Sequence, residues 1–279
     1  MTMRDLLVTV DGGPSSEARL TLAASLAEQF GAHLVGLHPS STAEVSHYSA
    51  SFDSALFDAA MQETFARLKQ RSERAQAGFE AVAARHTISS EWRVARGFAG
   101  PETVLNARYV DLAIVGQRWT DFDGLAYPDP ADVVLDAGCP VLVVPAVGHF
   151  DRIERHALVA WNASREAARA VRDALPLLKR VKSVTVLAID PSESPHGHGE
   201  QPGADIAQHL ARHGIKVEID TYSVPHANPA DVLLSRAADY GSDLIVMGAY
   251  GHSRVRELVL GGVTRSMLQQ MTVPVLMSH

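Results

Sequence analysis

Cysteine is almost absent from this chain, which has one, Cys139, in 279 residues. An intrachain disulfide framework is therefore excluded, and the surrounding Ala-Gly-Cys-Pro-Val-Leu predicts a buried, inert thiol. No apolar run approaches the roughly 20 residues that a membrane span needs. The first residues run directly into a short apolar strand and lack the small-residue pattern of a cleavage site. We therefore expect no signal peptide and a cytoplasmic protein.

Positive charge is not in excess either. The chain has 25 Lys and Arg residues against 32 Asp and Glu residues, a net charge of −7, which argues against nucleic-acid binding through a broad basic surface. The P-loop, the His-Glu-x2-His zinc helix and the Gly-x-Ser-x-Gly nucleophile elbow do not occur. No pair of side chains is typical of a general acid and base. The motifs that are present therefore indicate binding rather than catalysis.

The composition, with 46% hydrophobic and 20% charged residues, is typical of a globular protein, and the length suggests about two domains. The two halves resemble each other. Apolar runs and Ala-rich helical segments recur in the same order: residues 5–12 with 156–163, 17–30 with 166–178, 32–37 with 183–189, 111–116 with 243–248, and 139–144 with 273–277. Short β-rich runs that alternate with helices indicate βαβ units. We expect an α/β protein of two repeated domains, residues 1–148 and 149–279, each a five-stranded parallel open sheet flanked by helices.

The halves differ after the second strand. In the first half, residues 52–86 form a long insertion with helical apolar spacing, at positions such as Leu56, Ala60, Phe65, Leu68, Ala75 and Phe79. In the second half, residues 191–202 form a polar loop rich in Pro, Gly and Ser, which we expect to be exposed, and a helix over 204–213 comes next.

A glycine pattern near the end of the chain is its most informative motif. Gly248-Ala-Tyr-Gly251 follows a buried apolar run, and after nine residues Gly261-Gly262-Val263-Thr264 leads into a helix over 264–271. Glycines at a strand exit let the backbone approach a ligand closely. A helix start directs free N–H groups and the positive end of the helix dipole outward, which suits phosphate. The alternative is that these glycines only form tight turns.

This Gly-x2-Gly-x9-Gly spacing resembles the ATP-binding signature of the universal stress protein family, and the resemblance to its tandem members covers essentially the whole chain. It implies a Rossmann-like, adenine nucleotide alpha-hydrolase-like fold that binds ATP, with or without Mg²⁺, in the second half. The residues that match the family's binding positions are Asn162, Ile189, Met247, Gly248, Gly251, Gly261, Gly262, Val263 and Thr264. By this match Asn162 and Ile189 lie at the adenosine, Gly248 and Gly251 line the ribose and phosphates, and the residues from Gly261 to Thr264 hold the phosphates. Met247 ends the strand at the same edge of the expected pocket.

Two of these positions depart from the family. Asn162 stands where binding members have Asp, and it keeps an acceptor while it loses the charge. It is equally typical of a turn or cap before the next helix. Gly262 stands where Ser or Thr is usual, so one hydroxyl is lost, although the backbone N–H remains and Thr264 still supplies a hydroxyl. We expect weaker binding rather than none.

The first half lacks the phosphate-binding loop. Gly116-Gln-Arg-Trp119 replaces Gly-x2-Gly, and the acidic residues of segment 120–136 repel phosphate. Asp11 keeps the family's aspartate without its phosphate partners, so we predict that this half binds no ATP. Elsewhere, His196, His198, His209 and His213 are expected to be solvated rather than to bind a metal, since no Cys or carboxylate completes the set.

Three functions are compatible with these patterns. The first is a tandem universal stress protein, a stress-response factor that binds an adenine nucleotide and at most hydrolyses ATP slowly. The second is a scaffold of the same fold that binds a protein partner and no nucleotide, favoured by Asn162 and Gly262. The third is an enzyme of the wider α/β nucleotide-binding group, for which the chain has little spare length. The resemblance also implies that strands 140–144 and 274–277 pair, giving a pseudo-dimer within one chain, with a homodimer as a further option.

Overall fold

The protein is described here from a computed structural model, which covers residues 2–13, 15–39, 55–95, 97–118, 127–191, 201–223, 227–251 and 262–279. Side chains of the helix that begins at Ala55 are described from residue 62 onward. The chain forms two compact units, Met3–Cys139 and Pro140–His279. In the described part of the chain, no helix is long and apolar enough to cross a membrane.

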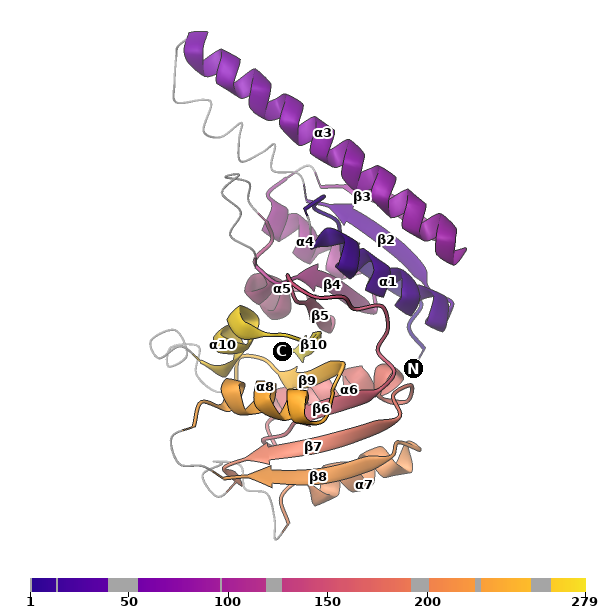
Figure 1. Ribbon diagram of the computed structural model, residues 1–279, viewed down its shortest axis with the longest axis vertical. Coiled ribbons are helices and arrows are strands. Elements are labelled where there is room, and N and C mark those ends of the chain that lie inside the picture. Colours follow the sequence, from indigo (N-terminus) through magenta and orange to yellow (C-terminus); the bar gives the residue numbers. More distant parts are fainter. Residues whose placement is uncertain are drawn as a thin grey trace. The chain divides into compact units, whose positions relative to one another are not determined.

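The unit Met3–Cys139 contains a parallel sheet with helices packed on it (Figure 1). Its strands lie in the order β3-β2-β1-β4 and all pair in parallel. Their bounds are β1 (Asp5–Thr9), β2 (His33–His38), β3 (Ser90–Val94) and β4 (Leu112–Gly116). The helices are α1 (Ser16–Phe30), α3 (Ala55–His86), α4 (Ala99–Ala107) and α5 (Pro130–Asp136).

The unit Pro140–His279 has the strand order β5-β10-β9-β6-β7-β8. The strands are β5 (Val141–Val144), β6 (His156–Ala160), β7 (Ser183–Ile189), β8 (Val217–Tyr222), β9 (Leu244–Gly248) and β10 (Val275–Ser278). The helices are α6 (Arg165–Leu178), α7 (Ala204–Arg212), α8 (Pro229–Asp239) and α10 (Val263–Gln270). The strands of the second repeat, β8-β7-β6-β9-β10, all pair in parallel, so the predicted five-stranded parallel sheet is confirmed there.

Strand β5 is the antiparallel member of this second unit. Val141 and Val143 pair with Met277 and Val275 of β10. The four side chains of β5 are buried, as a continuous apolar run predicts. The domain boundary after residue 148 stays a prediction, and so does the pseudo-dimer, although the two strands expected to pair do so.

The repeat extends to single hydrogen bonds at the amino ends of the strands. The Asp111 carboxylate, just before β4, accepts from the backbone N–H of Arg4 and Asp5 at 2.6 and 3.1 Å. In the second repeat, the Asp243 carboxylate before β9 accepts from the N–H groups of residues 154, 155 and 156 at 3.0, 2.8 and 3.1 Å. These aspartates satisfy the orphan donors at the start of β1 and β6. Asp243 thus has a structural role at the edge opposite the carboxyl ends of the strands.

The predicted helical insertion is helix α3, which lies along α1 and β2 (Figure 1). Three of its predicted apolar positions, Leu68, Ala75 and Phe79, are buried, whereas Phe65 is 40% exposed. Phe79 packs directly on Gly36 of β2, where a Cβ would lie 2.6 Å from the ring. Glycine at this strand position therefore lets α3 approach the sheet. Most of the polar loop predicted over 191–202 lies outside the described residues, and α7 comes after it as expected.

Candidate functional site

The predicted binding residues of the second repeat converge on one edge of its sheet. Ile189 is the last residue of β7, Gly248 is the last residue of β9, and Asn162 follows β6 by two positions. Because β7, β6 and β9 are parallel neighbours, their carboxyl ends share this edge, where ligands bind in open α/β sheets. Ile189 is half-buried and Met247 is buried with 5% exposure.

Gly248 is required for packing between β9 and α6. A Cβ at this position would lie 2.6 Å from the Ala167 nitrogen and from the Glu166 carbonyl carbon, both backbone atoms. Real Cβ atoms do not approach backbone so closely, so a larger residue forces the helix away from the strand. The conformational freedom of glycine is not needed at this position.

Gly251, in contrast, has no atom of the described residues within 4 Å of a Cβ placed on it. Between the two glycines, Tyr250 adopts a left-handed conformation with φ of 52°, which is uncommon for an aromatic residue. Its N–H donates to the Thr264 hydroxyl at 3.3 Å. This bond joins the loop after β9 to the first turn of α10, so the glycine loop and the helix start lie together as the motif predicts.

The start of α10 consists of Gly262 as N-cap, Val263 and Thr264. Gly262 offers no side-chain cap, and the first turn contains no acidic residue. Thr264 is only 2% exposed, and its hydroxyl already accepts the Tyr250 N–H. The Thr264 hydroxyl was expected to stand in for the Ser or Thr that family members have in place of Gly262. In the structure it is instead used to hold the loop after β9. Gly261 and residues 252–260 lie outside the described part of the chain.

Asn162 forms a turn at the entrance of α6. Its Oδ1 accepts from the Ser164 N–H at 3.1 Å, and Ser164 is the N-cap whose Oγ accepts from Ala167 N–H at 3.1 Å. Ala163 between them has φ of 58°. The turn interpretation of Asn162 is thus realised in the structure, while a contact with adenine stays a prediction.

A buried carboxylate lies beside this site. Glu166, in the first turn of α6, is 3% exposed, and its Oε1 is ion-paired with Arg165. Burial alone would raise the pKa of the Glu166 carboxyl, but Arg165 and nearby hydrogen-bond donors lower it below its ordinary value. Its Oε2 is buried and has no hydrogen-bond partner among the residues that the structure describes. A negative charge on Glu166 interacts favourably with the positive N-terminal end of the α6 dipole, and it repels a phosphate close to Gly248.

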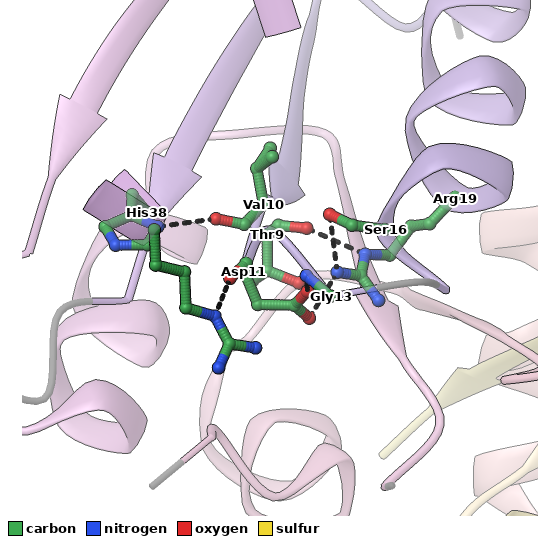
Figure 2. Close-up of polar contacts among 8 residues, drawn as sticks. Thr9, Val10, Asp11, Gly13, Ser16, Arg19 and His38 are labelled. Carbon is green, nitrogen blue, oxygen red and sulfur yellow. Dashed lines mark hydrogen bonds and ion pairs between the residues drawn. The ribbon is translucent and has the colours of Figure 1, made fainter. Parts of the chain in front are cut away.

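In the first repeat the family's aspartate has internal partners (Figure 2). Asp11 accepts from the Gly13 N–H at 2.8 Å and forms an ion pair of 2.6 Å with Arg19, which is 2% exposed. Arg19 also donates through Nε to the Thr9 carbonyl at 2.7 Å. Its Nη1 fills the space beside Gly116, where a Cβ would lie only 2.0 Å away.

The charge on Asp11 is stabilised by this arrangement. Burial alone would raise the pKa of the carboxyl, but the Arg19 guanidinium, the Gly13 N–H and Arg71 lower it below 3.8. Arg71 reaches this place from α3 and donates through Nε to the Asp11 carbonyl at 2.5 Å. The residue before Asp11 in the chain has a partner as well: Nδ1 of the buried His38 ring lies 2.7 Å from the Val10 carbonyl oxygen.

Sequence reasoning did not identify Arg19 and Arg71, which lie 8 and 60 residues from their Asp11 partner. The signal available in the sequence for Arg19 was a single arginine within an otherwise Ala- and Leu-rich helical segment. In the acidic stretch, Asp129 turns out to cap α5, since it accepts from Ala131 N–H at 2.9 Å, and to bind Arg118 at 2.9 Å.

The histidines do not form a described metal centre. The ring centres of His209, on α7, and His213, its C-cap, lie 4.8 Å apart with the rings edge-on, and His196 and His198 lie outside the described residues. Within the ranges that the structure covers, no group of three or more His, Cys, Asp or Glu side chains is arranged to hold a metal.

The fold and this edge define a class of protein: a tandem repeat of an α/β domain with parallel strands and a candidate ligand site at their carboxyl ends. Residues 2–145 and 154–279 each match the universal stress protein family, so the chain belongs to that family. A universal stress protein of Synechocystis is 42% identical over 67 residues, 24% of this chain and 22% of that protein. One of Methanocaldococcus jannaschii is 33% identical over 73 residues, 26% of this chain and 43% of that protein.

A solved structure shows the same fold over the full length. The crystal structure of a universal stress protein from Archaeoglobus fulgidus aligns with a TM-score of 0.68 at 17% identity, covering 100% of this chain and 96% of that one. The curated relatives, by contrast, match over less than half of their own length.

Proposed function

We propose that the second repeat binds an adenine nucleotide, with ATP as the first candidate, and that the protein acts as a cytoplasmic stress-response factor. The observation that carries the proposal is the hydrogen bond from Tyr250 N–H to Thr264, which joins the Gly248–Gly251 loop to the start of α10. Family membership supports it. No described residue lies within 4 Å of a Cβ at Gly251, which is compatible with close approach of a ligand to the backbone.

Five of the predicted residues have a defined part in this proposal. Asn162 and Ile189 would contact the adenosine, and Gly251 with the N–H groups of Val263 and Thr264 would face the ribose and phosphates. Mg²⁺, where present, would neutralise part of the phosphate charge, which matters because of the neighbouring Glu166 carboxylate. Ile189 is half-buried at the strand end, which suits an apolar contact with a base.

The experiment is calorimetric titration of the purified, nucleotide-stripped protein with Mg-ATP, and we expect one site per chain. Gly251→Gln should weaken binding at least tenfold without loss of stability, because its side chain enters open space within the site. Gly78→Gln is the matched control, since Gly78 on α3 also has nothing within 4 Å. Two sites per chain, or unchanged binding by Gly251→Gln, would contradict the assignment.

The second candidate is a scaffold that binds a protein partner and no nucleotide. Glu166 favours it, since a buried carboxylate beside Gly248 repels phosphate, and so does the engagement of the Thr264 hydroxyl. Absence of heat and of any ATP-dependent change in melting temperature would select this function. The glycines would then be required by packing and turns alone.

A further inference from the structure

The residues that end β10 bond directly to the loop after β9. The two strands pair in parallel as far as Ser278, which lies opposite Gly248 (Figure 1). One further backbone bond follows, because the Ala249 N–H donates to the Ser278 carbonyl at 2.9 Å. The next residue, His279, then reaches the same loop residue with its side chain, and its Nδ1 lies 3.1 Å from the Ala249 carbonyl oxygen. Two consecutive residues thus bond both backbone polar groups of Ala249.

The contact between His279 and Ala249 has a defined direction. A carbonyl oxygen only accepts hydrogen bonds, so Nδ1 of His279 carries the hydrogen and donates it. Ala249 is fully buried, and a buried carbonyl that loses its partner is costly. The half-buried His279 ring therefore supplies a donor at the place where the loop leaves the sheet.

This bond and the bond to Thr264 hold opposite ends of one peptide group. Its carbonyl belongs to Ala249 and accepts from His279, and its N–H belongs to Tyr250 and donates to the Thr264 hydroxyl at 3.3 Å. A peptide group is planar, so bonds at both ends fix the orientation of the plane. That orientation helps to set the φ of 52° at Tyr250, a conformation that persists in a non-glycine residue only where its surroundings maintain it.

The imidazole ring also contacts the side chain of Tyr250. The two ring centres lie 6.4 Å apart and the ring planes meet at 81°, an edge-on arrangement within the range of favourable aromatic pairs. His279 therefore contacts both residues between Gly248 and Gly251, one through a hydrogen bond and the other through its ring.

The first repeat has no such donor in its sequence. Its segment 140–144 corresponds to 274–278, which places Pro145 where the second repeat has His279. Proline has no side-chain hydrogen-bond donor. The same repeat lacks the second glycine of the motif, since Trp119 stands there. The histidine and the glycine motif thus occur together in one repeat and are both replaced in the other.

We propose that His279 is a positioning residue of the candidate nucleotide site, which holds the Ala249–Tyr250 peptide so that the loop keeps the conformation in which a ligand approaches Gly251. This role rests on the proposed function, since it serves the binding of an adenine nucleotide there. A loop that is ordered before binding loses less conformational entropy when the ligand arrives, so its affinity is higher.

Three variants of the full-length protein separate the hydrogen bond from the ring contact in calorimetric titration with Mg-ATP. His279→Asn keeps a donor attached to Cγ, as Nδ1 is, and should stay within about twofold of the unaltered affinity. His279→Gln moves the amide one bond outward and His279→Phe keeps only a ring, so both should weaken binding at least about fivefold. His33→Phe is the control and should stay within about twofold, because it also removes a histidine Nδ1 bond, to Ser89, but in the first repeat.

Hydrogen exchange of the Tyr250 N–H, followed by NMR without nucleotide, tests the hold on the loop independently. We expect exchange at least about fivefold faster in His279→Gln and His279→Phe, and nearly unchanged in His279→Asn and His33→Phe. If circular dichroism shows that His279→Phe does not fold, His279→Gln carries the comparison with His279→Asn.

Unchanged exchange in both His279→Gln and His279→Phe would overturn the role, whatever the protein binds. Faster exchange with unchanged affinity for Mg-ATP would overturn it too, because the conformation of the loop would not affect the ligand. An equal loss of affinity in His279→Asn would show that the hydrogen bond is not responsible. If the unaltered protein binds no Mg-ATP while exchange follows the expected pattern, the proposed function fails and only the hold of His279 on the loop is confirmed.

Discussion

At the scale of single residues, Asp11 and Asn162 show how one position of a repeat is used in two ways. Both side chains accept from the backbone N–H two residues further on, at 2.8 and 3.1 Å. Only Asp11 adds a charge, and that charge is matched by Arg19, which is fully enclosed. The aspartate that the family resemblance assigns to the nucleotide is thus part of the internal structure of the first repeat.

Asp11→Asn should lower the free energy of unfolding by about 3 kcal/mol at pH 7, because it leaves the Arg19 guanidinium buried without its counter-ion. Asp173→Asn is the control: Asp173 pairs with the half-exposed Arg169, and its loss should cost under about 1 kcal/mol. Urea denaturation of the variants measures both values. Equal effects of the two substitutions would show that the Asp11–Arg19 ion pair contributes no more to stability than the Asp173–Arg169 pair.

The same pair sets a dependence on pH. Since the pKa of Asp11 is lowered below 3.8 in the folded protein, the unfolded chain binds its proton first as the pH falls. The stabilisation is therefore complete above about pH 4 and is lost as the pH falls through the folded pKa. Unfolding free energies measured at pH 7 and pH 3 should show the difference between the unaltered protein and Asp11→Asn shrinking at the lower pH.

At the scale of elements, Gly248 and Gly251 have separate tasks within one motif. Gly248 lets β9 contact the backbone of α6, whereas no described residue lies within 4 Å of a Cβ at Gly251. A glycine pattern in sequence contains both kinds of position, because a packing requirement and a ligand requirement both exclude a side chain. The distances from a Cβ placed on each glycine to its neighbours distinguish the packing position from the other one.

Gly248→Ala should therefore cost about 1–3 kcal/mol of stability, since its Cβ would have to displace the backbone of residues 166 and 167. Gly251→Ala should change stability by no more than about 0.5 kcal/mol. Thermal unfolding of the two variants in the absence of nucleotide makes the comparison. Similar melting temperatures for both would mean that α6 does not pack on β9 as tightly as described.

Hydrophobic patterns in the sequence predicted the buried strands but did not predict the strands at the sheet edges. Strands such as β1 and β9 were recognised from continuous apolar runs, because both of their faces are covered. Strands β3 and β8 were not, since Ser-Glu-Trp-Arg-Val and Val-Glu-Ile-Asp-Thr-Tyr are not continuous apolar runs, and none of their side chains is fully buried. Hydrophobic periodicity has no signal for a strand held mainly by backbone hydrogen bonds at an edge.

The candidate sites likewise contain some features that local sequence patterns predicted and others that they did not. The position of the glycine motif at a strand end and a helix start was predicted, because it depends on local patterns. Arg19 and Arg71 were not, since their role arises only when α1 and α3 are packed beside the end of β1. Tertiary contacts decide which charged residue enters a site, and a single sequence does not contain them.

At the scale of the whole molecule, β5 connects the two repeats in sequence and belongs structurally to the unit Pro140–His279. Its residues match the end of the first repeat, yet they pair with β10, the last strand of the second. The predicted boundary after residue 148 and the structural division at Pro140 therefore give different expectations for separate fragments.

A fragment of residues 140–279 should be more stable than one of residues 149–279 by at least about 3 kcal/mol, because the shorter fragment loses four buried apolar side chains and exposes the edge of β10. Guanidinium denaturation of both fragments, followed by circular dichroism, measures the difference. A fragment of residues 145–279 is the control: it lacks β5 and keeps the linker, so it should resemble 149–279. If all three are equally stable, β5 contributes nothing to this unit and the boundary after residue 148 is the better one.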